Sequence, residues 1–103
     1  MNDAVARYQK LLEQFPDNEL ARFSLGKAYF DLGQFTTAKE QFELALQRKP
    51  GWMAAQILAG KCELALGNRA AAKAAFERAR QLALEQNHEG PLEEMNQLLG
   101  EMG

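Results

Sequence analysis

The side chains of this chain that could carry out chemistry are few and do not cluster. There is one cysteine, Cys62, and one histidine, His88. A thiol nucleophile needs a base at hydrogen-bond distance, and His88 falls in an expected loop, so we interpret Cys62 as a small buried thiol. One Cys and one His cannot complete a zinc site by themselves, and a single cysteine excludes an internal disulfide. The sequence therefore predicts no cofactor, no metal site and no enzymatic activity.

The acidic residues near the C-terminal end do not form a catalytic pair either. Glu93 and Glu94 are adjacent, so on a helix their carboxylates point in different directions. The sequence also lacks a glycine-rich phosphate loop and a nucleophile elbow. The net charge is −2, with acids and bases mixed along most of the chain. This balance gives no reason to expect nucleic acid as a partner.

Length and hydropathy narrow the class of protein further. A chain of 103 residues is expected to form a single domain, 1–103. No apolar run approaches the roughly 20 residues needed to span a bilayer, so we expect no membrane partner. The first residues lack the basic and then apolar pattern of a signal peptide, and we therefore expect a cytoplasmic location.

Hydrophobic spacing near 3.6 residues predicts helices throughout, and no segment shows the alternation of a strand. Proline and glycine at Pro16, Pro50-Gly51, Gly67-Asn68 and Gly90-Pro91 separate the periodic segments. Gly33 is expected to end its helix in the left-handed conformation. The expected helices are about 3–15, 19–32, 35–48, 52–66, 69–86 and 91–99. The short connections between them favour antiparallel neighbours.

The chain repeats itself with a constant offset, which we call the repeat period. When residues 53–86 are aligned with 19–52, eleven positions match without a gap, including Gly26 with Gly60 and Phe42 with Phe76. A glycine inside a helix costs about 0.5–1 kcal/mol relative to Ala, so its recurrence indicates close packing. We expect Gly26 to lie against Ala38, and Gly60 against the equivalent alanine. A fixed period of about 34 residues is typical of stacked helix–turn–helix units.

At these residues the sequence resembles the tetratricopeptide repeat family, whose pattern is W-x2-L-G-x2-Y, then A-x3-F, then P. The central unit reads Leu25-Gly26-x2-Tyr29, Ala38-x3-Phe42 and Pro50, without the Trp. The next unit departs from the pattern at Glu63, where Tyr is expected, and at Leu84, where Pro is expected.

The resemblance implies an all-α fold, a short right-handed α-solenoid of antiparallel helix pairs with about 2.5 repeats and a C-terminal capping helix. Glu93 and Glu94 fall where the next Leu-Gly pair would lie, which is why the last helix is expected to be a cap. The expected units are a half repeat (3–16), a repeat (19–52), a degenerate repeat (53–86) and the capping helix (91–100).

The resemblance also implies a concave groove lined by the first helix of each unit. The groove candidates, spaced three to four residues apart on each helix, are Leu20, Phe23, Lys27, Phe30, Asp31, Ala54, Ile57, Lys61 and Leu64. Phe23 and Phe30 either fill core space or form an apolar patch for a partner. Lys27 and Lys61 either snorkel into solvent or bind a carboxylate of an otherwise apolar peptide. Trp52 is expected to pack across the joint between repeats, with an exposed partner anchor as the alternative.

These patterns predict a non-catalytic protein-interaction module, a scaffold whose groove binds a peptide segment of a partner protein. The expected peptide is apolar and carries an acidic group. The alternative is self-association as a weak homodimer through the end helices, with the first helix or residues 92–102 as the contact. A variant of this alternative places the chain's own C-terminal tail in the groove. Whether the chain is a monomer, and whether its last helix caps the stack or fills the groove, stays open at this point.

Overall fold

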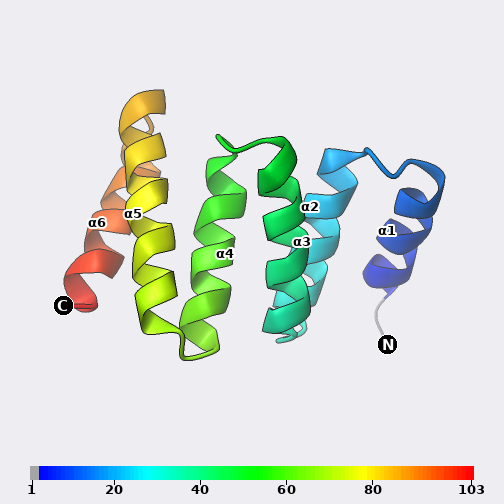
Figure 1. Ribbon diagram of the computed structural model, residues 1–103, viewed down its shortest axis with the longest axis horizontal. Coiled ribbons are helices and arrows are strands. Elements are labelled where there is room, and N and C mark those ends of the chain that lie inside the picture. Colours follow the sequence, from blue (N-terminus) through cyan, green and yellow to red (C-terminus); the bar gives the residue numbers. More distant parts are fainter. Residues whose placement is uncertain (1–2) are drawn as a thin grey trace.

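The computed structural model describes residues 3–103, which form six α-helices and no β-strand (Figure 1). The helices are α1 (Asp3–Gln14), α2 (Glu19–Asp31), α3 (Phe35–Arg48), α4 (Met53–Ala65), α5 (Arg69–Gln86) and α6 (Glu89–Glu101). The expected all-α class is confirmed.

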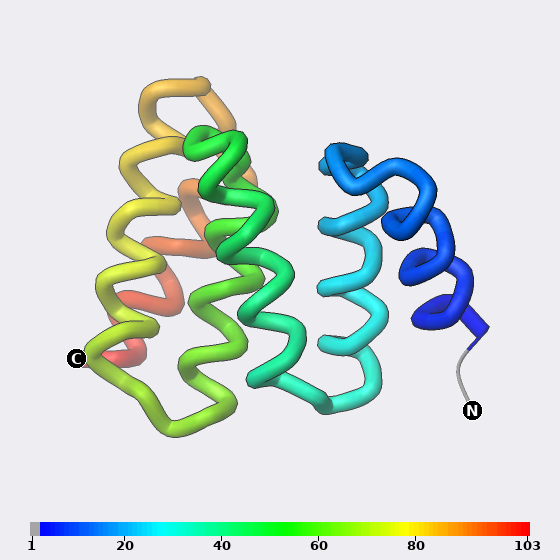
Figure 2. Tube along the Cα trace, turned by 45° about the vertical axis from the view of Figure 1, so that its right-hand side comes forward, coloured from blue at the N-terminus to red at the C-terminus, as the bar shows by residue number. Residues whose placement is uncertain are grey.

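The helices follow one another along the long axis of a molecule that measures 41 × 28 × 20 Å (Figure 1). Each helix packs against the next, and α2 and α4 also approach each other, with Cα atoms within 8 Å. Among the described residues, α1, α3 and α5 make no such contact with one another, so α2 and α4 lie on the inner side of the stack. The first and last helices, α1 and α6, lie at opposite ends of the molecule (Figure 2). The fold is therefore the expected short solenoid of antiparallel helix pairs.

Local signals in the sequence set the helix ends. Asn18 precedes α2, and its side-chain oxygen accepts a hydrogen bond from the backbone N–H of Ala21 at 3.0 Å. Gly33 and Gly67 follow α2 and α4 with φ angles of 79° and 82°, which is the left-handed conformation expected for Gly33. Asn87 follows α5 with a φ of 57°, because Asn enters this region more readily than most residues with a side chain.

The repeated glycines make room for the repeated phenylalanine rings. A Cβ atom on Gly26 would lie 2.8 Å from Cε1 of Phe42, and one on Gly60 would lie 2.6 Å from Cε1 of Phe76. Both rings are fully buried. The helices of each pair do cross closely, and the atoms nearest to the Gly26 position belong to Phe42 and Gln41. Ala38 is not among the three nearest neighbours of the Gly26 position, because the aromatic ring, which is larger, reaches the glycine first.

The last helix leaves the register of the repeat by two residues. α4 begins and ends one repeat period after α2, whereas α6 begins and ends one period plus two residues after α4. The cause is α5, which continues to Gln86 and leaves a connection of only two residues. As a result α6 begins at Glu89 and not at Pro91. Pro91 fits inside the first turn because the first four N–H groups of a helix have no acceptor within it.

The shift changes which residue of α6 faces the stack. In the register of α4, Met95 takes the place of Ala59, a place that the repeat period had given to Glu93. Met95 is fully buried and packs in one cluster with Met53 and Ile57 of α4 and with Leu82 of α5. The last helix is therefore part of the hydrophobic core.

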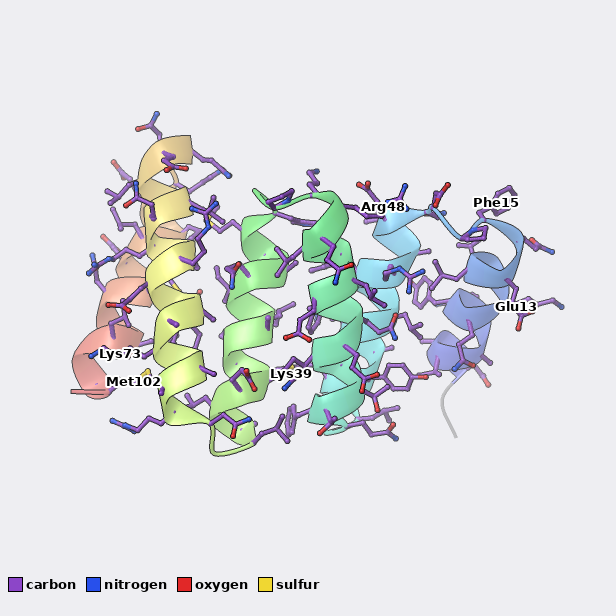
Figure 3. All side chains as sticks on the ribbon, in the orientation of Figure 1. Glu13, Phe15, Lys39, Arg48, Lys73 and Met102 are labelled. Carbon is purple, nitrogen blue, oxygen red and sulfur yellow. The ribbon has the colours of Figure 1, made fainter. Side chains whose placement is uncertain are left out.

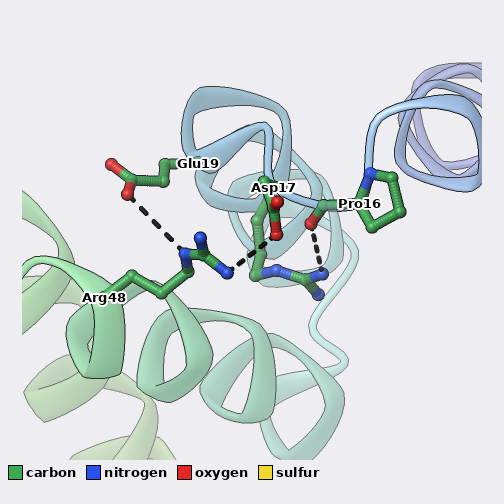
Figure 4. Close-up of polar contacts among 5 residues, drawn as sticks. Pro16, Asp17, Glu19 and Arg48 are labelled. Atoms are coloured by element: carbon green, nitrogen blue, oxygen red, sulfur yellow. Dashed lines mark hydrogen bonds and ion pairs between the residues drawn. The ribbon is translucent and has the colours of Figure 1, made fainter.

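Side chains from neighbouring helix pairs fix the loops at one edge of the stack. Arg48, the last residue of α3, forms ion pairs with Asp17 at 2.8 Å and Glu19 at 3.8 Å (Figure 4). Trp52, just ahead of α4, stacks on Phe23 of α2 with the ring centroids 4.8 Å apart. The prediction that Trp52 packs across the joint between the helix pairs is confirmed.

Candidate partner-binding surface

The inner side of the stack presents exposed side chains from α2 and α4. Five of the nine groove candidates are exposed there, and we call these five the inner surface: Leu20, Lys27, Asp31, Ala54 and Leu64. Among residues 3–103, Leu20 is the most exposed large apolar side chain, at 67%. The inner surface therefore combines apolar groups with a cation and an anion, and none of its members is needed to fill the core.

Three other candidates contribute mainly to the core. Phe23 lies against Phe42 with ring centroids 5.7 Å apart, and Phe30 meets Phe35 edge to face at 5.4 Å. Both Phe23 and Phe30 are half-buried and pack against the cluster between α3 and α4. Ile57 is only 9% exposed and lies in the cluster that also contains Met95 of α6. A ligand on the inner side could touch the edges of the two rings, but Ile57 is covered.

The two equivalent lysines have different neighbours. Nζ of Lys27 lies 3.8 Å from a carboxylate oxygen of Asp31 on the same helix, and both side chains are more than half exposed. Nζ of Lys61 donates a hydrogen bond to Oε2 of Glu94 on α6 at 2.9 Å. Exposed ion pairs contribute about 0–1 kcal/mol. A ligand carboxylate can therefore compete for Lys27, whereas at Lys61 it must displace Glu94, whose helix is anchored in the core by the buried Met95.

Reasoning from the sequence missed the role of Glu94. Its approach to Lys61 depends on the two-residue shift of α6, and neither residue carries a signal for that shift. The shift follows from the length of α5 and from the short connection after it. The C-terminal helix thus reaches the inner side at Lys61, while Met95 anchors it in the core.

A polar bridge replaces the tyrosine of the repeat pattern in the second unit. Oε1 of Glu63 accepts hydrogen bonds from Asn68 at 3.0 Å and from Lys39 of α3 at 3.2 Å. The hydrogen bond from Asn68, together with Lys39, lowers the pKa of Glu63, and the hydrogen bond to Glu63 raises the pKa of Lys39. Lys39 lies where α3 meets α4 (Figure 3). This bridge joins two helix pairs and is structural.

The thiol beside this bridge is not activated. Cys62 is fully buried, and burial raises the pKa of its thiol to about 11. The interpretation of Cys62 as a buried thiol is confirmed. Residues 3–103 also contain no group of three or more His, Cys, Asp or Glu side chains that could hold a metal ion. The same residues include no helix that is long and apolar enough to cross a bilayer.

A second feature lies beside the inner surface, between the first two helices. Two residues of α1 and four of α2 line a cleft of about 270 Å³, which we call the α1–α2 cleft: Ala4, Tyr8, Ser24, Lys27, Ala28 and Asp31. Reasoning from the sequence did not identify this cleft. The available signal was Ala4-x3-Tyr8, which matches the A-x3-F of a second helix in a unit.

Stacked antiparallel helix pairs with an exposed inner surface define a helical-repeat interaction module. A family model described as tetratricopeptide repeat matches residues 1–51. The chain belongs to the tetratricopeptide repeat family, as the pattern of residues predicted.

Similar proteins share this fold. The TPR repeat-containing protein PA0015 of Pseudomonas aeruginosa is 38% identical over 69 residues, which cover 67% of this chain and 66% of that protein. The solution structure of protein BPP2914 from Bordetella parapertussis is 30% identical with a TM-score of 0.88, covering 99% of this chain and 89% of the other. The first TPR of Spaghetti (RPAP3), bound to the HSP90 peptide SRMEEVD, is 26% identical with a TM-score of 0.77, covering 90% and 72%.

Proposed function

We propose that this protein is a non-catalytic scaffold that binds a peptide segment of a partner protein along its inner surface. The observation that carries the proposal is the exposure of Leu20 and Leu64 on the two inner helices, together with Lys27. Exposed apolar groups around a cation suit a peptide that is largely apolar and carries a carboxylate. The peptide held by the RPAP3 domain, SRMEEVD, is acidic, which supports the proposed carboxylate of the peptide.

Of the two lysines, Lys27 is the one that we propose to bind the carboxylate. Its ion pair with Asp31 spans 3.8 Å, a long distance for a charge-assisted hydrogen bond. Lys61 is held by Glu94 at 2.9 Å. The peptide would therefore lie across both inner helices, with its carboxylate close to Lys27 of α2 and its apolar side chains on Leu20 of α2 and Leu64 of α4.

A matched pair of alanine substitutions tests the location. Ala54 lies on the inner side of α4 and Ala74 on the outer helix α5, and both are exposed. Peptides that bind the chain are selected from a random display library, and their dissociation constants are measured by fluorescence anisotropy. We expect Ala54→Arg to weaken binding at least about tenfold, or about 1.4 kcal/mol, and Ala74→Arg to leave it unchanged. Equal binding to both variants would place the peptide elsewhere.

A charge test addresses the carboxylate. Each selected peptide is compared with a copy whose acidic groups are converted to amides. Lys27→Gln should weaken the acidic peptide and have little effect on the amide copy, because only the acid uses the cation. The ratio of the dissociation constants of the acidic and amide peptides is measured for the native chain and for Lys27→Gln. If this ratio is the same for both proteins, Lys27 does not bind the carboxylate, even if the peptide lies on the inner surface.

The remaining features of the proposal follow from the sequence. We propose a cytoplasmic protein with no cofactor, no nucleic-acid partner and no membrane partner. The alternative function is weak homodimerisation through the end helices, and sedimentation over a range of concentrations tests it, because a monomer at every concentration excludes it. If the C-terminal tail competed with the peptide, removal of residues 90–103 would strengthen binding. The buried position of Met95 favours the opposite result, a loss of stability.

A further inference from the structure

The residues that line the α1–α2 cleft are equivalent, one repeat period earlier, to residues that are covered in the core. Four of its lining residues, Ala4, Tyr8, Ser24 and Ala28, lie one repeat period before Ala38, Phe42, Leu58 and Cys62. These four counterparts all belong to the hydrophobic cluster between α2, α3 and α4. The cleft and the cluster are therefore lined by equivalent residues. The lining is open at the cleft and covered at the cluster, and we call the position of Ala38, Phe42, Leu58 and Cys62 the covered place.

The side chains that pack at the covered place indicate which residues would fit the α1–α2 cleft. Phe23 and Phe30 of α2 pack against that cluster, and Gly26 between them receives the ring of Phe42. α2 thus contributes large apolar side chains at positions i and i+7 and a glycine at i+3. α4 carries the same spacing at Ile57, Gly60 and Leu64, of which Ile57 and Gly60 pack against α5 and Leu64 is exposed on the inner surface. Among the described helices, α1 contacts only α2, so this role is not performed at Tyr8 by any of them.

We propose that the α1–α2 cleft docks an amphipathic helix of a second protein, with large apolar residues at i and i+7 and Gly at i+3. The two large side chains would lie against Ser24 and Ala28, and the glycine would lie over the ring of Tyr8. Recognition of a helix through apolar residues on one face is a common mode of peptide binding. The site adjoins the proposed peptide site on the inner surface, and the two sites share Lys27 and Asp31.

Charge defines one more position of the docking helix. In the covered place, Arg22, the residue before Phe23, donates a hydrogen bond to Gln41 at 3.1 Å. The counterpart of Gln41 in α1 is Arg7, which lies beside Tyr8 with its guanidinium carbon 5.2 Å from the ring centroid. The docking helix should therefore carry Asp or Glu at position i−1, where its carboxylate pairs with Arg7.

A second copy of this chain does not meet these requirements. The helix at the other end of the stack is α6, and its outward positions are the counterparts of Met53, Ile57, Gly60 and Leu64 at the offset that separates α6 from α4. Those counterparts are Glu89, Glu93, Asn96 and Gly100, which offer no large apolar side chain. α2 and α4 do carry the pattern, but Phe23, Phe30 and Ile57 already pack within the core of their own chain. A second copy of this chain is therefore not the occupant that fits these requirements.

A peptide made from this chain's own sequence supplies the probe. It comprises residues 50–68 with Gln56→Glu, which places an acid one residue before Ile57, and a lactam bridge on its outward face stabilises the helix. A fluorophore at its end reports binding by anisotropy. We expect saturable binding to the full chain, and at least about tenfold weaker binding of the same peptide with Gly60→Leu, because its side chain would meet Tyr8.

Variants of the chain separate this cleft from the inner surface. Ser24→Arg fills the cleft and should weaken probe binding at least about tenfold, whereas Ala54→Arg, outside the cleft, should leave it unchanged. The Arg7→Glu variant should bind the probe more weakly than the native chain does. The same variant should bind a peptide with Lys at position 56 more tightly than the probe, because the charges are then exchanged. Binding that is insensitive to Ser24→Arg, or lost with Ala54→Arg, would overturn the proposal without deciding the function of the inner surface.

A covalent version removes the dependence on peptide affinity. Residues 19–34 are placed directly before Met1, so that the repeat period continues, with Arg22→Glu in the added segment. We expect a higher unfolding midpoint and loss of probe binding, and neither effect when the added segment carries Gly26→Leu. An unchanged midpoint would overturn the proposal. A second result would also overturn the proposal. If the chain alone sediments as a dimer and that dimer does not bind the probe, a second copy covers the cleft.

Discussion

Substitution of Gly60 by Ala tests whether the close packing of glycine against an aromatic ring holds the helix pairs together. The new Cβ atom would lie 2.6 Å from Cε1 and 2.8 Å from Cδ1 of Phe76, and 3.1 Å from Cβ of Ala75. Phe76 is fully buried, so its ring cannot move into solvent. Overpacking of this kind costs about 1–3 kcal/mol, and Ala in place of Gly in a helix returns about 0.5–1 kcal/mol. The difference spans about 0–2.5 kcal/mol, and because two contacts fall below 3.0 Å we expect a net loss of about 1–2 kcal/mol.

This loss corresponds to a fall in Tm of about 5–15 °C for a domain of this size. Urea unfolding followed by circular dichroism and by the fluorescence of Trp52 measures it. Gly100→Ala is the matched control, since nothing lies within 4 Å of a Cβ at that helical position, and it should leave stability unchanged or raise it by up to about 1 kcal/mol. Gly26→Ala, with its nearest contact at 2.8 Å, should be milder than Gly60→Ala. A Gly60→Ala protein as stable as the native chain would refute the reasoning.

Three further substitutions or reagents test other parts of the structure. Met95→Ala should lower the free energy of unfolding by about 2–4 kcal/mol, because it empties a fully buried position under α6. A loss below about 1 kcal/mol would show that α6 is not part of the core. Iodoacetamide at pH 8 should modify Cys62 slowly in the native chain and quickly in urea, since the thiol is buried and its pKa is about 11. Rapid alkylation of the native chain would contradict that burial. Glu63→Gln should destabilise the chain at pH 6 and much less at pH 3. A folded pKa below the unfolded value of about 4.3 gives stability above that value, which is lost as pH falls through the folded pKa. A stability difference that stays constant from pH 6 to pH 3 would remove the hydrogen-bonded carboxylate from the explanation.

The sequence was sufficient for the fold because its strongest signals are local and repeated. Pro16 and Gly33 mark helix ends whatever the tertiary structure, and Gly26 and Phe42 recur one repeat period later in the same roles. The partner of Gly26 could not be read in the same way. Ala38 and Phe42 both lie on the facing side of α3, and the direction of the Phe side chain decides which one reaches the glycine first.

The position of α6 could not be predicted on the assumption that the repeat period is constant. The absence of Pro at Leu84 indicated that α5 would continue, but the length of its extension and of the following connection together set the offset. An offset two residues longer than the repeat period buries Met95 and brings Glu94 to Lys61. A shift of two residues rotates the inward-facing side of a helix by more than half a turn. The contacts of α6 therefore depend on its two-residue offset, which the repeat period does not give.

Equivalence within a repeat predicts the backbone and the core better than it predicts binding. Lys27 and Lys61 have the same residue type, the same place in the period and inner helices of equal length. They nevertheless differ in what they can bind, because the next inner helix presents Leu58 at the position where α6 presents Glu94. The core repeats because each unit must bury the same surfaces against its neighbours. The surface does not repeat, because the chemistry of each exposed position depends on the side chain that the adjacent unit places beside it. Partner recognition in this chain should therefore be assigned helix by helix, and not by transfer from one repeat to the next.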